Sequence, residues 1–121
     1  MSKYWINIRY LTKYLILPTA TPFSNPSWFG FPITLRENIK FKREELLYYL
    51  EENNIGTRLL FAGNVVKQPY MINQKYRIVG RLKVSDLIMK NSFWIGLYPG
   101  LKKDNLHYVS DKIHKFIKSY S

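Results

Sequence analysis

The stretch of sequence that decides the fold reads Trp28-Phe29-Gly30-Phe31-Pro32-Ile33-Thr34. It is aromatic and β-branched, and polar loop residues lie on both sides of it, which is typical of a β-strand. The glycine at position 30 indicates a bulge, or the close approach of another group to the backbone. Because side chains alternate along a strand, Trp28 and Gly30 are expected to face one way and Phe29 and Phe31 the other.

Helices are predicted on both sides of this strand. A first helix over residues 3–15 follows from apolar side chains spaced four, three and four apart, at Tyr4, Ile8, Leu11 and Leu15. A second helix covers residues 41–54, with Leu46, Leu47 and Leu50 on its buried side. The last helix presents one apolar face made of Leu106, Val109, Ile113, Phe116, Ile117 and Tyr120.

Two further strands, 57–61 and 93–98, are expected, with a short helix over 84–89 and an irregular segment over 62–74. Three strands separated by helices, together with a long terminal helix, predict an α/β two-layer sandwich. A chain of 121 residues is large enough for one domain, so residues 1–121 are expected to form a single domain with a lead-in helix over 1–17.

Composition excludes several classes of protein. The chain has no cysteine, which excludes disulfides and thiolate metal sites within it. No segment approaches the roughly 20 apolar residues that span a bilayer, and the short apolar run before Pro18 is not a signal peptide, so we expect a cytoplasmic protein. Aromatic residues make up 17%, which predicts an aromatic core or an aromatic binding surface.

The net charge of +11 suggests a polyanionic partner, but the distribution of the charges does not favour nucleic acid. Lysine and arginine occur from Lys3 to Lys118 in blocks of at most two, and acidic pairs such as Glu44-Glu45 and Glu51-Glu52 interrupt them. Nucleic-acid contact needs a continuous basic face. A small anionic ligand, or an acidic domain that packs against this one, is the simpler partner.

No complete catalytic set is present in the sequence. His107 and His114 lie seven residues apart on the terminal helix, but a metal site needs a third ligand, so two solvent-facing histidines are expected. The two glutamate pairs are interpreted as a solvated helix face, with Glu44-Glu45 at the positive N-terminal end of the helix. Gly63-Asn64 and the glycines at 96 and 100 lack the spacing of a phosphate-binding loop and indicate turns.

Two features are candidates for binding. An arginine at position 58, inside an apolar strand, costs desolvation unless an anion or a carboxylate meets it; an ion pair with a nearby glutamate is the structural alternative. Trp28 and Phe29 allow two predictions. Either one of these aromatic side chains lines a pocket shared with another domain, or both pack within this domain. The residues by themselves leave these two readings open.

Three blocks in order resemble a known family. They are the strand quoted above, Ile55-Gly56-Thr57-Arg58-Leu59-Leu60-Phe61-Ala62-Gly63-Asn64, and Asn91-Ser92-Phe93-Trp94-Ile95-Gly96-Leu97-Tyr98-Pro99-Gly100-Leu101. Together they resemble the C-terminal small domain of the nucleotide-sugar 3-dehydrases of the DegT/DnrJ-type, vitamin B6-dependent superfamily. The similarity is greatest to enzymes acting on CDP-4-keto-6-deoxyglucose in lipopolysaccharide biosynthesis, and it covers nearly the whole chain.

The resemblance implies a small, mainly antiparallel sheet with helices on one face over residues 18–121. It also implies that the cofactor-binding large domain is absent from this chain. The full enzymes use pyridoxamine or pyridoxal phosphate, and some carry an iron–sulfur cluster; this chain is expected to hold no cofactor and no catalytic residue, and to be inactive by itself. By the resemblance, its substrate-facing residues are Trp28, Phe29, Arg58, Asn64 and Gln68, and its partners are the large domain and a nucleotide-linked 4-keto-6-deoxyhexose.

Two alternatives remain. A small domain of a sugar aminotransferase would usually carry a His-Tyr-Pro type pattern where this chain has residues 60–64, which favours the dehydrase. A free-standing basic module would bind nucleotides or nucleic acid through Trp28, Phe29, Trp94 and scattered lysines. Self-association is also expected, through an exposed apolar face made of the Tyr4/Ile8/Leu11 helix and the 28–31 strand.

Overall fold

A four-stranded antiparallel sheet stands at the centre of residues 5–121, the part of the chain that this computed structural model describes. The strands follow the order β1-β2-β4-β3, so the two strands at its middle, β2 and β4, are far apart in sequence. Their bounds are β1 (Leu15–Ile16), β2 (Gly30–Leu35), β3 (Thr57–Leu59) and β4 (Ser92–Gly96). The helices are η1 (Trp5–Lys13), α1 (Arg43–Glu52), α2 (Lys83–Asn91) and α3 (Lys103–Lys118), with short 3-10 turns η2 (Val65–Lys67) and η3 (Pro69–Met71).

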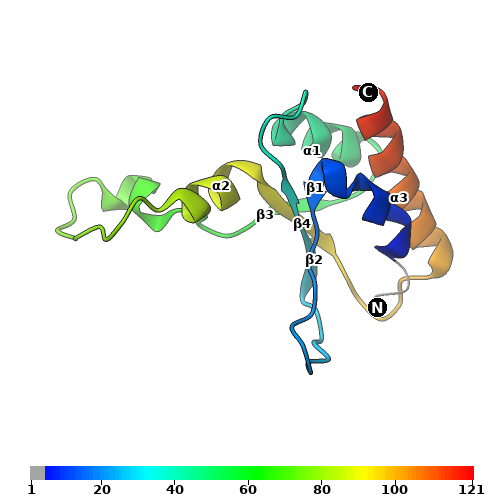
Figure 1. The fold of residues 1–121 in the computed structure, drawn as a ribbon, viewed down its shortest axis with the longest axis horizontal. Coiled ribbons are helices and arrows are strands. Elements are labelled where there is room, and N and C mark those ends of the chain that lie inside the picture. The colour runs from blue at the N-terminus through cyan, green and yellow to red at the C-terminus, as the bar shows by residue number, and fades with distance from the viewer. Residues whose placement is uncertain (1–4) are drawn as a thin grey trace.

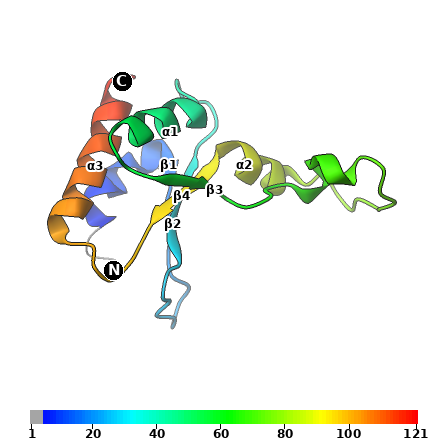
Figure 2. The same cartoon turned by 180° about the vertical axis from the view of Figure 1, so that it is seen from behind.

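Helices α1, α3 and η1 cover one face of the sheet (Figure 1). The opposite side bears α2 and residues 60–82, which project away from the sheet as an arm (Figure 2). The predicted two-layer sandwich with an antiparallel sheet is therefore confirmed. The sheet contains one strand, β1, that the sequence did not predict. With only two residues, β1 is too short to show a recognisable alternation of apolar and polar side chains.

The core lies between the sheet and the covering helices. Alternate residues of β2 point into it, so Phe31, Ile33 and Leu35 are buried while the residues between them are half-buried. The register pairs Phe31 with Ile95 and Ile33 with Phe93, so the two central strands present one apolar face to the helices. The helices meet this face with Ile8, Leu11, Leu46, Leu50, Leu106, Ile113, Phe116 and Ile117.

The first helix differs from the prediction. Residues 5–13 form a 3-10 helix, in which residues three apart share a face, and this brings Ile8 and Leu11 to the core together. Leu15, the last residue of the predicted helical stripe, pairs with Leu35 in the sheet instead. The predicted exposed face is therefore wrong at Ile8 and Leu11, which are buried, while Tyr4 lies outside the described residues.

Two strand ends also differ from the prediction. Strand β2 begins at Gly30 rather than at Trp28, because its partner β4 ends at Gly96, directly opposite Gly30. Strand β3 ends at Leu59, where the chain turns sharply and the backbone N–H of Phe61 donates to the Leu59 carbonyl oxygen at 2.9 Å. Within the predicted exposed stretch 28–31, Phe31 is in fact buried.

The terminal helix matches its prediction. Leu106, Ile113, Phe116 and Ile117 are buried on one face of α3, and Val109 packs at the margin. Tyr120 follows the helix and packs on Phe116 with the ring centroids 5.1 Å apart. Part of the aromatic content predicted for the core is thus found where α3 meets α1 and Phe41.

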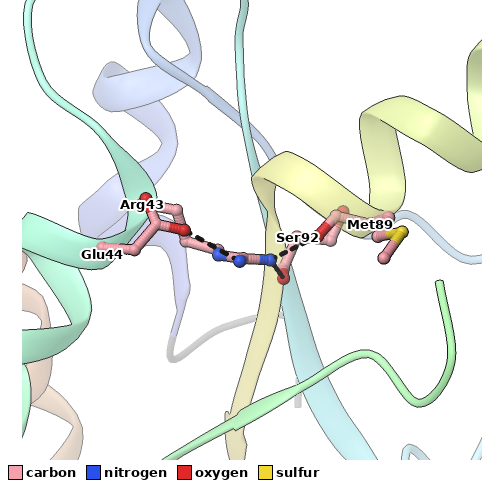
Figure 3. A network of polar contacts seen from close by, with 4 residues as sticks. All are labelled: Arg43, Glu44, Met89 and Ser92. Carbon is pink, nitrogen blue, oxygen red and sulfur yellow. Dashed lines mark hydrogen bonds and ion pairs between the residues drawn. The ribbon is translucent and has the colours of Figure 1, made fainter. Parts of the chain in front are cut away.

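Arg43 ties α1 to the junction between α2 and β4 (Figure 3). Its Nη1 donates to the carbonyl oxygens of Met89 at 2.7 Å and Ser92 at 3.2 Å, and its Nη2 meets Glu44 Oε1 at 2.9 Å. The side chain of Arg43 is only 12% exposed and Ser92 is buried, so water has little access to these contacts. Removing the Arg43 side chain should therefore lower the free energy of unfolding more than removing an exposed arginine side chain does.

We expect Arg43→Ala to lower the free energy of unfolding by about 2 kcal/mol, because it removes charge-assisted hydrogen bonds to two shielded carbonyl groups. Urea denaturation followed by circular dichroism measures the change. Arg81→Ala is the matched control, since Arg81 is exposed on the arm. Equal stability of the two variants would contradict the role given to Arg43.

Candidate functional site

The sheet face opposite α1, α3 and η1 carries a row of three side chains centred on Trp94. The register places Pro32 and Arg58 on either side of Trp94, so these three side chains lie across β2, β4 and β3. Side chains directly opposite in antiparallel strands interact. The row therefore depends on the same pairing that buries Phe31 and Ile33 on the other face.

Gly30 allows the indole of Trp94 to lie over β2. A Cβ atom added at Gly30 would stand 2.3 Å from Cε3 of Trp94, closer than two carbon atoms approach. The Phe29 ring packs beside the same indole, with 5.1 Å between ring centroids. The glycine predicted to allow close approach is thus confirmed in that role, and the group that approaches is Trp94.

The aromatic residues surround an open hollow of about 180 Å³. Phe61 stands at its margin, 81% exposed, with a φ of 46°, a left-handed backbone conformation that is rare for a bulky residue. Such conformations are retained where the surrounding structure holds them, and they cluster at binding sites. The hollow is lined by Trp28, Phe29, Gly30, Pro32, Leu60, Phe61 and Trp94.

The structure therefore brings Trp28 and Phe29 to one hollow, Trp28 half-buried and Phe29 77% exposed. The sequence did not predict that Leu60 and Phe61 would join them. For Trp94, the sequence suggests only a stacking role in a nucleotide-binding module. The available signal was the glycine at position 30 inside an aromatic strand, which indicates that a large group lies across it. Because the lining is apolar, the hollow suits the face of a ring or a deoxygenated carbon, and not a phosphate.

Arg58 was expected to be embedded in an apolar strand, and this is wrong. Its side chain is exposed, and Nη1 donates to the carbonyl oxygen of the preceding Thr57 at 2.8 Å. Strand β3 lies at the edge of the sheet, so Arg58 reaches water directly. The desolvation argument for a bound anion therefore fails, although the side chain remains beside Trp94 and available to a ligand.

Asn64 and Gln68 hold the loop that follows β3. Asn64 is 3% exposed and donates from Nδ2 to Asp86 Oδ1 at 2.7 Å, and Gln68 donates from Nε2 to the Ala62 carbonyl oxygen at 2.7 Å. Lys67 contacts the same oxygen of Asp86 at 2.7 Å. Hydrogen bonds from Lys67 and then from Asn64 lower the pKa of the Asp86 carboxyl. These contacts fix the loop to α2, and the substrate contact of Asn64 and Gln68 stays a prediction.

Glu51 fixes the start of β3, and through it the position of Arg58. One oxygen, Oε1, accepts both the backbone N–H of Thr57 at 2.7 Å and its hydroxyl at 2.8 Å. These bonds, the backbone one first, lower the pKa of the Glu51 carboxyl. Glu51 is exposed, as predicted for a solvated helix face, and its carboxylate has a structural role in addition.

The pair Glu44-Glu45 behaves as expected at the start of α1. Glu45 Oε2 accepts the backbone N–H of Lys42 at 2.6 Å. Hydrogen bonding to its own backbone N–H, followed by the bond and the charge of Arg43, lowers the pKa of Glu44. Both carboxylates therefore stabilise the helix N-terminus.

The two histidines of α3 do not lie in one environment. His114 packs edge-on against Tyr10, with 5.0 Å between ring centroids, and its Nδ1 atom is buried. The prediction of a solvent-facing side chain is thus wrong for His114, and it holds for His107, which is exposed. Among residues 5–121, no three histidine, aspartate or glutamate side chains converge as metal ligands would. No helix in that range is long and apolar enough to cross a bilayer.

Comparison with known proteins places these features in a family. The model described as the DegT/DnrJ/EryC1/StrS aminotransferase family matches residues 4–114. The lipopolysaccharide biosynthesis protein RfbH of Salmonella typhimurium is 56% identical over 105 residues, covering 87% of this chain and 24% of RfbH. The dTDP-4-dehydro-2,6-dideoxy-D-glucose 3-dehydratase of Saccharopolyspora spinosa is 45% identical over 107 residues, covering 88% and 23%. The chain thus spans about a quarter of the length of the curated relatives it matches.

Solved structures share the fold at low sequence identity. The E. coli GDP-4-keto-6-deoxy-D-mannose-3-dehydratase with bound hydrated PLP superposes with a TM-score of 0.80 at 20% identity, covering 92% of this chain and 28% of that one. A structure of such a dehydratase with bound GDP-perosamine also gives 0.80 at 20% identity, covering 93% and 29%. A DegT/DnrJ/EryC1/StrS aminotransferase from Brucella abortus gives 0.76 at 16% identity, covering 95% and 28%.

We expect Gly30→Ala to lower the free energy of unfolding by about 1–3 kcal/mol, because the new methyl group overlaps the Trp94 indole. The shift of Trp94 should also change the tryptophan fluorescence. Gly96→Ala is the matched control: Gly96 pairs with Gly30 across the ladder, and an added Cβ there meets no atom within 4 Å. If Gly30→Ala is as stable as Gly96→Ala, the hollow does not depend on this close approach.

Glu51→Gln should remove part of the acid sensitivity of the fold. The carboxyl has a lower pKa in the folded chain than its ordinary 4.5, so its contribution is complete above that pH and is lost as the pH falls below it. The variant should therefore be less stable at neutral pH and lose less stability on acidification, which denaturation between pH 7 and pH 3 measures. Glu52→Gln is the control, because it removes one negative charge and leaves the hydrogen bonds between Glu51 and Thr57 intact. Parallel stability curves for wild type and Glu51→Gln would contradict the assignment.

Proposed function

Because this chain belongs to the DegT/DnrJ/EryC1/StrS aminotransferase family, we propose that it forms the C-terminal small domain of a cytoplasmic nucleotide-sugar 3-dehydratase. The observation that carries the proposal is the aromatic hollow on the sheet face opposite α1, α3 and η1. Relatives about four times as long are named as dehydratases or as a lipopolysaccharide biosynthesis protein. The pathway we propose is the synthesis of deoxysugars for lipopolysaccharide.

The hollow acts as an apolar wall of an active site in this proposal. Phe29 and Trp94 present ring faces and edges to the deoxygenated part of a 4-keto-6-deoxyhexose, and Trp28 closes one side. An apolar wall excludes water, which protects a reactive intermediate and strengthens polar contacts nearby. Arg58, exposed beside Trp94, is placed to meet an anionic group of the nucleotide.

The hollow does not fit the B6 cofactor itself. Its lining has no amine that could form a Schiff base and no side-chain donor for a phosphate group. We therefore assign the cofactor to another domain of the enzyme, where it supplies the electron sink for the chemistry. An iron–sulfur cluster would likewise take its ligands from elsewhere, since this chain has no cysteine.

Dehydratase is favoured over aminotransferase by sequence identity and not by fold. The curated relatives at 45% and 32% identity are named 3-dehydratases, whereas dehydratase and aminotransferase structures share the fold alike, at 20% and 16% identity. The segment Leu60-Phe61-Ala62-Gly63-Asn64 supports the same choice, since it lacks the His-Tyr-Pro type pattern that a sugar aminotransferase would usually carry there. A nucleic-acid-binding module stays the alternative from a different class; it predicts binding to single-stranded DNA that weakens steeply with salt.

A chimaera tests the proposal. The segment of Salmonella RfbH that aligns with this chain is replaced by residues 4–114, and the chimaera is expressed in a strain lacking RfbH. We expect lipopolysaccharide carrying O-antigen to be restored on gels. Phe29→Ala in the chimaera should lower the dehydratase rate by about tenfold or more, through loss of positioning at the hollow.

Two controls make the outcome specific. Phe23→Ala changes another exposed phenylalanine, in the loop before β2 and not among the residues that line the hollow, and should leave the rate unchanged. Titration of the isolated chain with pyridoxal phosphate should give no saturable aldimine absorbance. A folded chimaera that fails to restore O-antigen, or a saturable aldimine on the isolated chain, would count against the proposed function.

A further inference from the structure

The turn after β3 forms one wall of the aromatic hollow. Leu60 and Phe61 line the hollow from this turn, and the other lining residues come from β2, from β4 and from the segment before β2. The backbone N–H of Phe61 donates to the Leu59 carbonyl oxygen at 2.9 Å. The backbone N–H of Gly63 donates to the Leu60 carbonyl oxygen at 3.1 Å. These bonds lie within residues 59–63, so they do not by themselves fix the turn against the rest of the domain.

Helix α2 supplies the contacts that fix the turn. Asp86 and Met89 are three residues apart in α2 and therefore lie on one face of it. Asn64, which is 3% exposed, donates from Nδ2 to Asp86 Oδ1 at 2.7 Å. Gly63 packs directly on the helix backbone, because a Cβ atom added there would stand 2.7 Å from the Cα atom of Met89. The φ of Gly63 is 61°, in the left-handed region that favours glycine. The turn thus meets α2 at two neighbouring points.

Helix α2 is itself held at the level of Met89. Arg43 of α1 donates to the carbonyl oxygen of Met89 at 2.7 Å, as Figure 3 shows. A path of contacts therefore runs from α1 through α2 to the turn, and it ends at Phe61 on the margin of the hollow. Phe61 has a φ of 46°, a conformation that a bulky residue keeps only where the surrounding structure holds it. The contacts with α2 are the ones that hold it.

We propose that Asp86 is a positioning residue, which acts through Asn64 to hold Phe61 at the margin of the hollow. There the phenylalanine ring sets how tightly the hollow binds the apolar face of a sugar ring. When the bond between Asp86 and Asn64 is lost, the turn relaxes toward a more common backbone conformation and the Phe61 ring leaves the hollow. The inference rests on the proposed function for the ligand, a nucleotide-linked 4-keto-6-deoxyhexose. It does not rest on that function for the position of the ring.

A purely structural role for Asp86 predicts different kinetics. Asp86 lies in the first turn of α2, where a carboxylate stabilises the positive end of the helix. Loss of that effect lowers the fraction of folded enzyme, which lowers the apparent kcat and leaves KM unchanged. Loss of the Phe61 ring from the hollow removes a contact made alike in the ground state and the transition state, which raises KM and leaves kcat unchanged. The two roles therefore change different kinetic parameters.

Variants of the RfbH chimaera test the assignment. We expect Asp86→Ala and Phe61→Ala each to raise KM for the nucleotide sugar by about tenfold, with kcat changed by less than about threefold. Because Asp86 acts through Phe61, the double variant should raise KM no further than either single variant. Asp86→Asn should stay within about threefold of the unsubstituted chimaera. Its amide oxygen still accepts the Asn64 N–H, and only the charge that pairs with the exposed Lys67 is lost.

The same comparison in the isolated chain needs no enzyme activity. Trp28 and Trp94, two of the three tryptophans, line the hollow together with Phe61. Both are half-buried, so displacement of the Phe61 ring should increase the quenching of tryptophan fluorescence by acrylamide. We expect Asp86→Ala and Phe61→Ala to increase the quenching constant by similar amounts, and the double variant to increase it no further.

Asp111→Ala is the matched control, because the Asp111 carboxylate also pairs with a lysine, Lys115 at 2.8 Å, but on α3. Neither KM nor quenching should change in it. The assignment of Asp86 is wrong if Asp86→Ala leaves quenching unchanged, if its effect adds to that of Phe61→Ala, or if it lowers kcat at an unchanged KM. It is also wrong if Asp86→Asn is as impaired as Asp86→Ala. An inactive chimaera with non-additive quenching would support the positioning of Phe61 and count against the proposed function alone.

Discussion

The pairing of β2 with β4 is the constraint on which the rest of the structure depends. These strands are separated by more than fifty residues, and they align Gly30 with Gly96 and Thr34 with Ser92 without a bulge. Because side chains alternate, this single register buries Phe31 and Phe93 beneath the helices and leaves Trp94 on the opposite face. A shift by one residue would exchange the two faces, placing Trp94 in the core and the core residues in water.

Side chains of helix α1 hold the segments next to the central strand pair in place. At its first turn, Arg43 meets the carbonyl groups at the junction of α2 and β4, and at its last turn Glu51 receives both polar hydrogens of Thr57. The two contacts lie at opposite ends of one rigid element. Strand β3 and the loop after it are therefore positioned relative to Trp94 by polar contacts, and the apolar core beneath only supports them.

Aromatic residues have different roles on the two faces of the sheet. On the helical side Phe41, Phe116 and Tyr120 pack against one another around α3 and bring the layers together. On the opposite side Phe29 and Trp94 remain accessible around a hollow whose shape depends on the lack of a side chain at Gly30. Aromatic rings that stay exposed around such a hollow form a binding surface, and this is the physical basis on which a sugar-facing role is proposed.

The sequence by itself determined the terminal helix, the α/β class and the strand at the centre of the sheet. Their signals are local: a helical spacing from Leu106 to Ile117, and aromatic and β-branched residues around Phe31. Only the tertiary structure decided where β2 and β3 end, because a strand ends where its partner does. It also decided that Ile8 is buried, that Arg58 is exposed at a sheet edge, and that Trp94 completes the hollow. Each of these depends on contacts between residues distant in sequence, which local periodicity does not record.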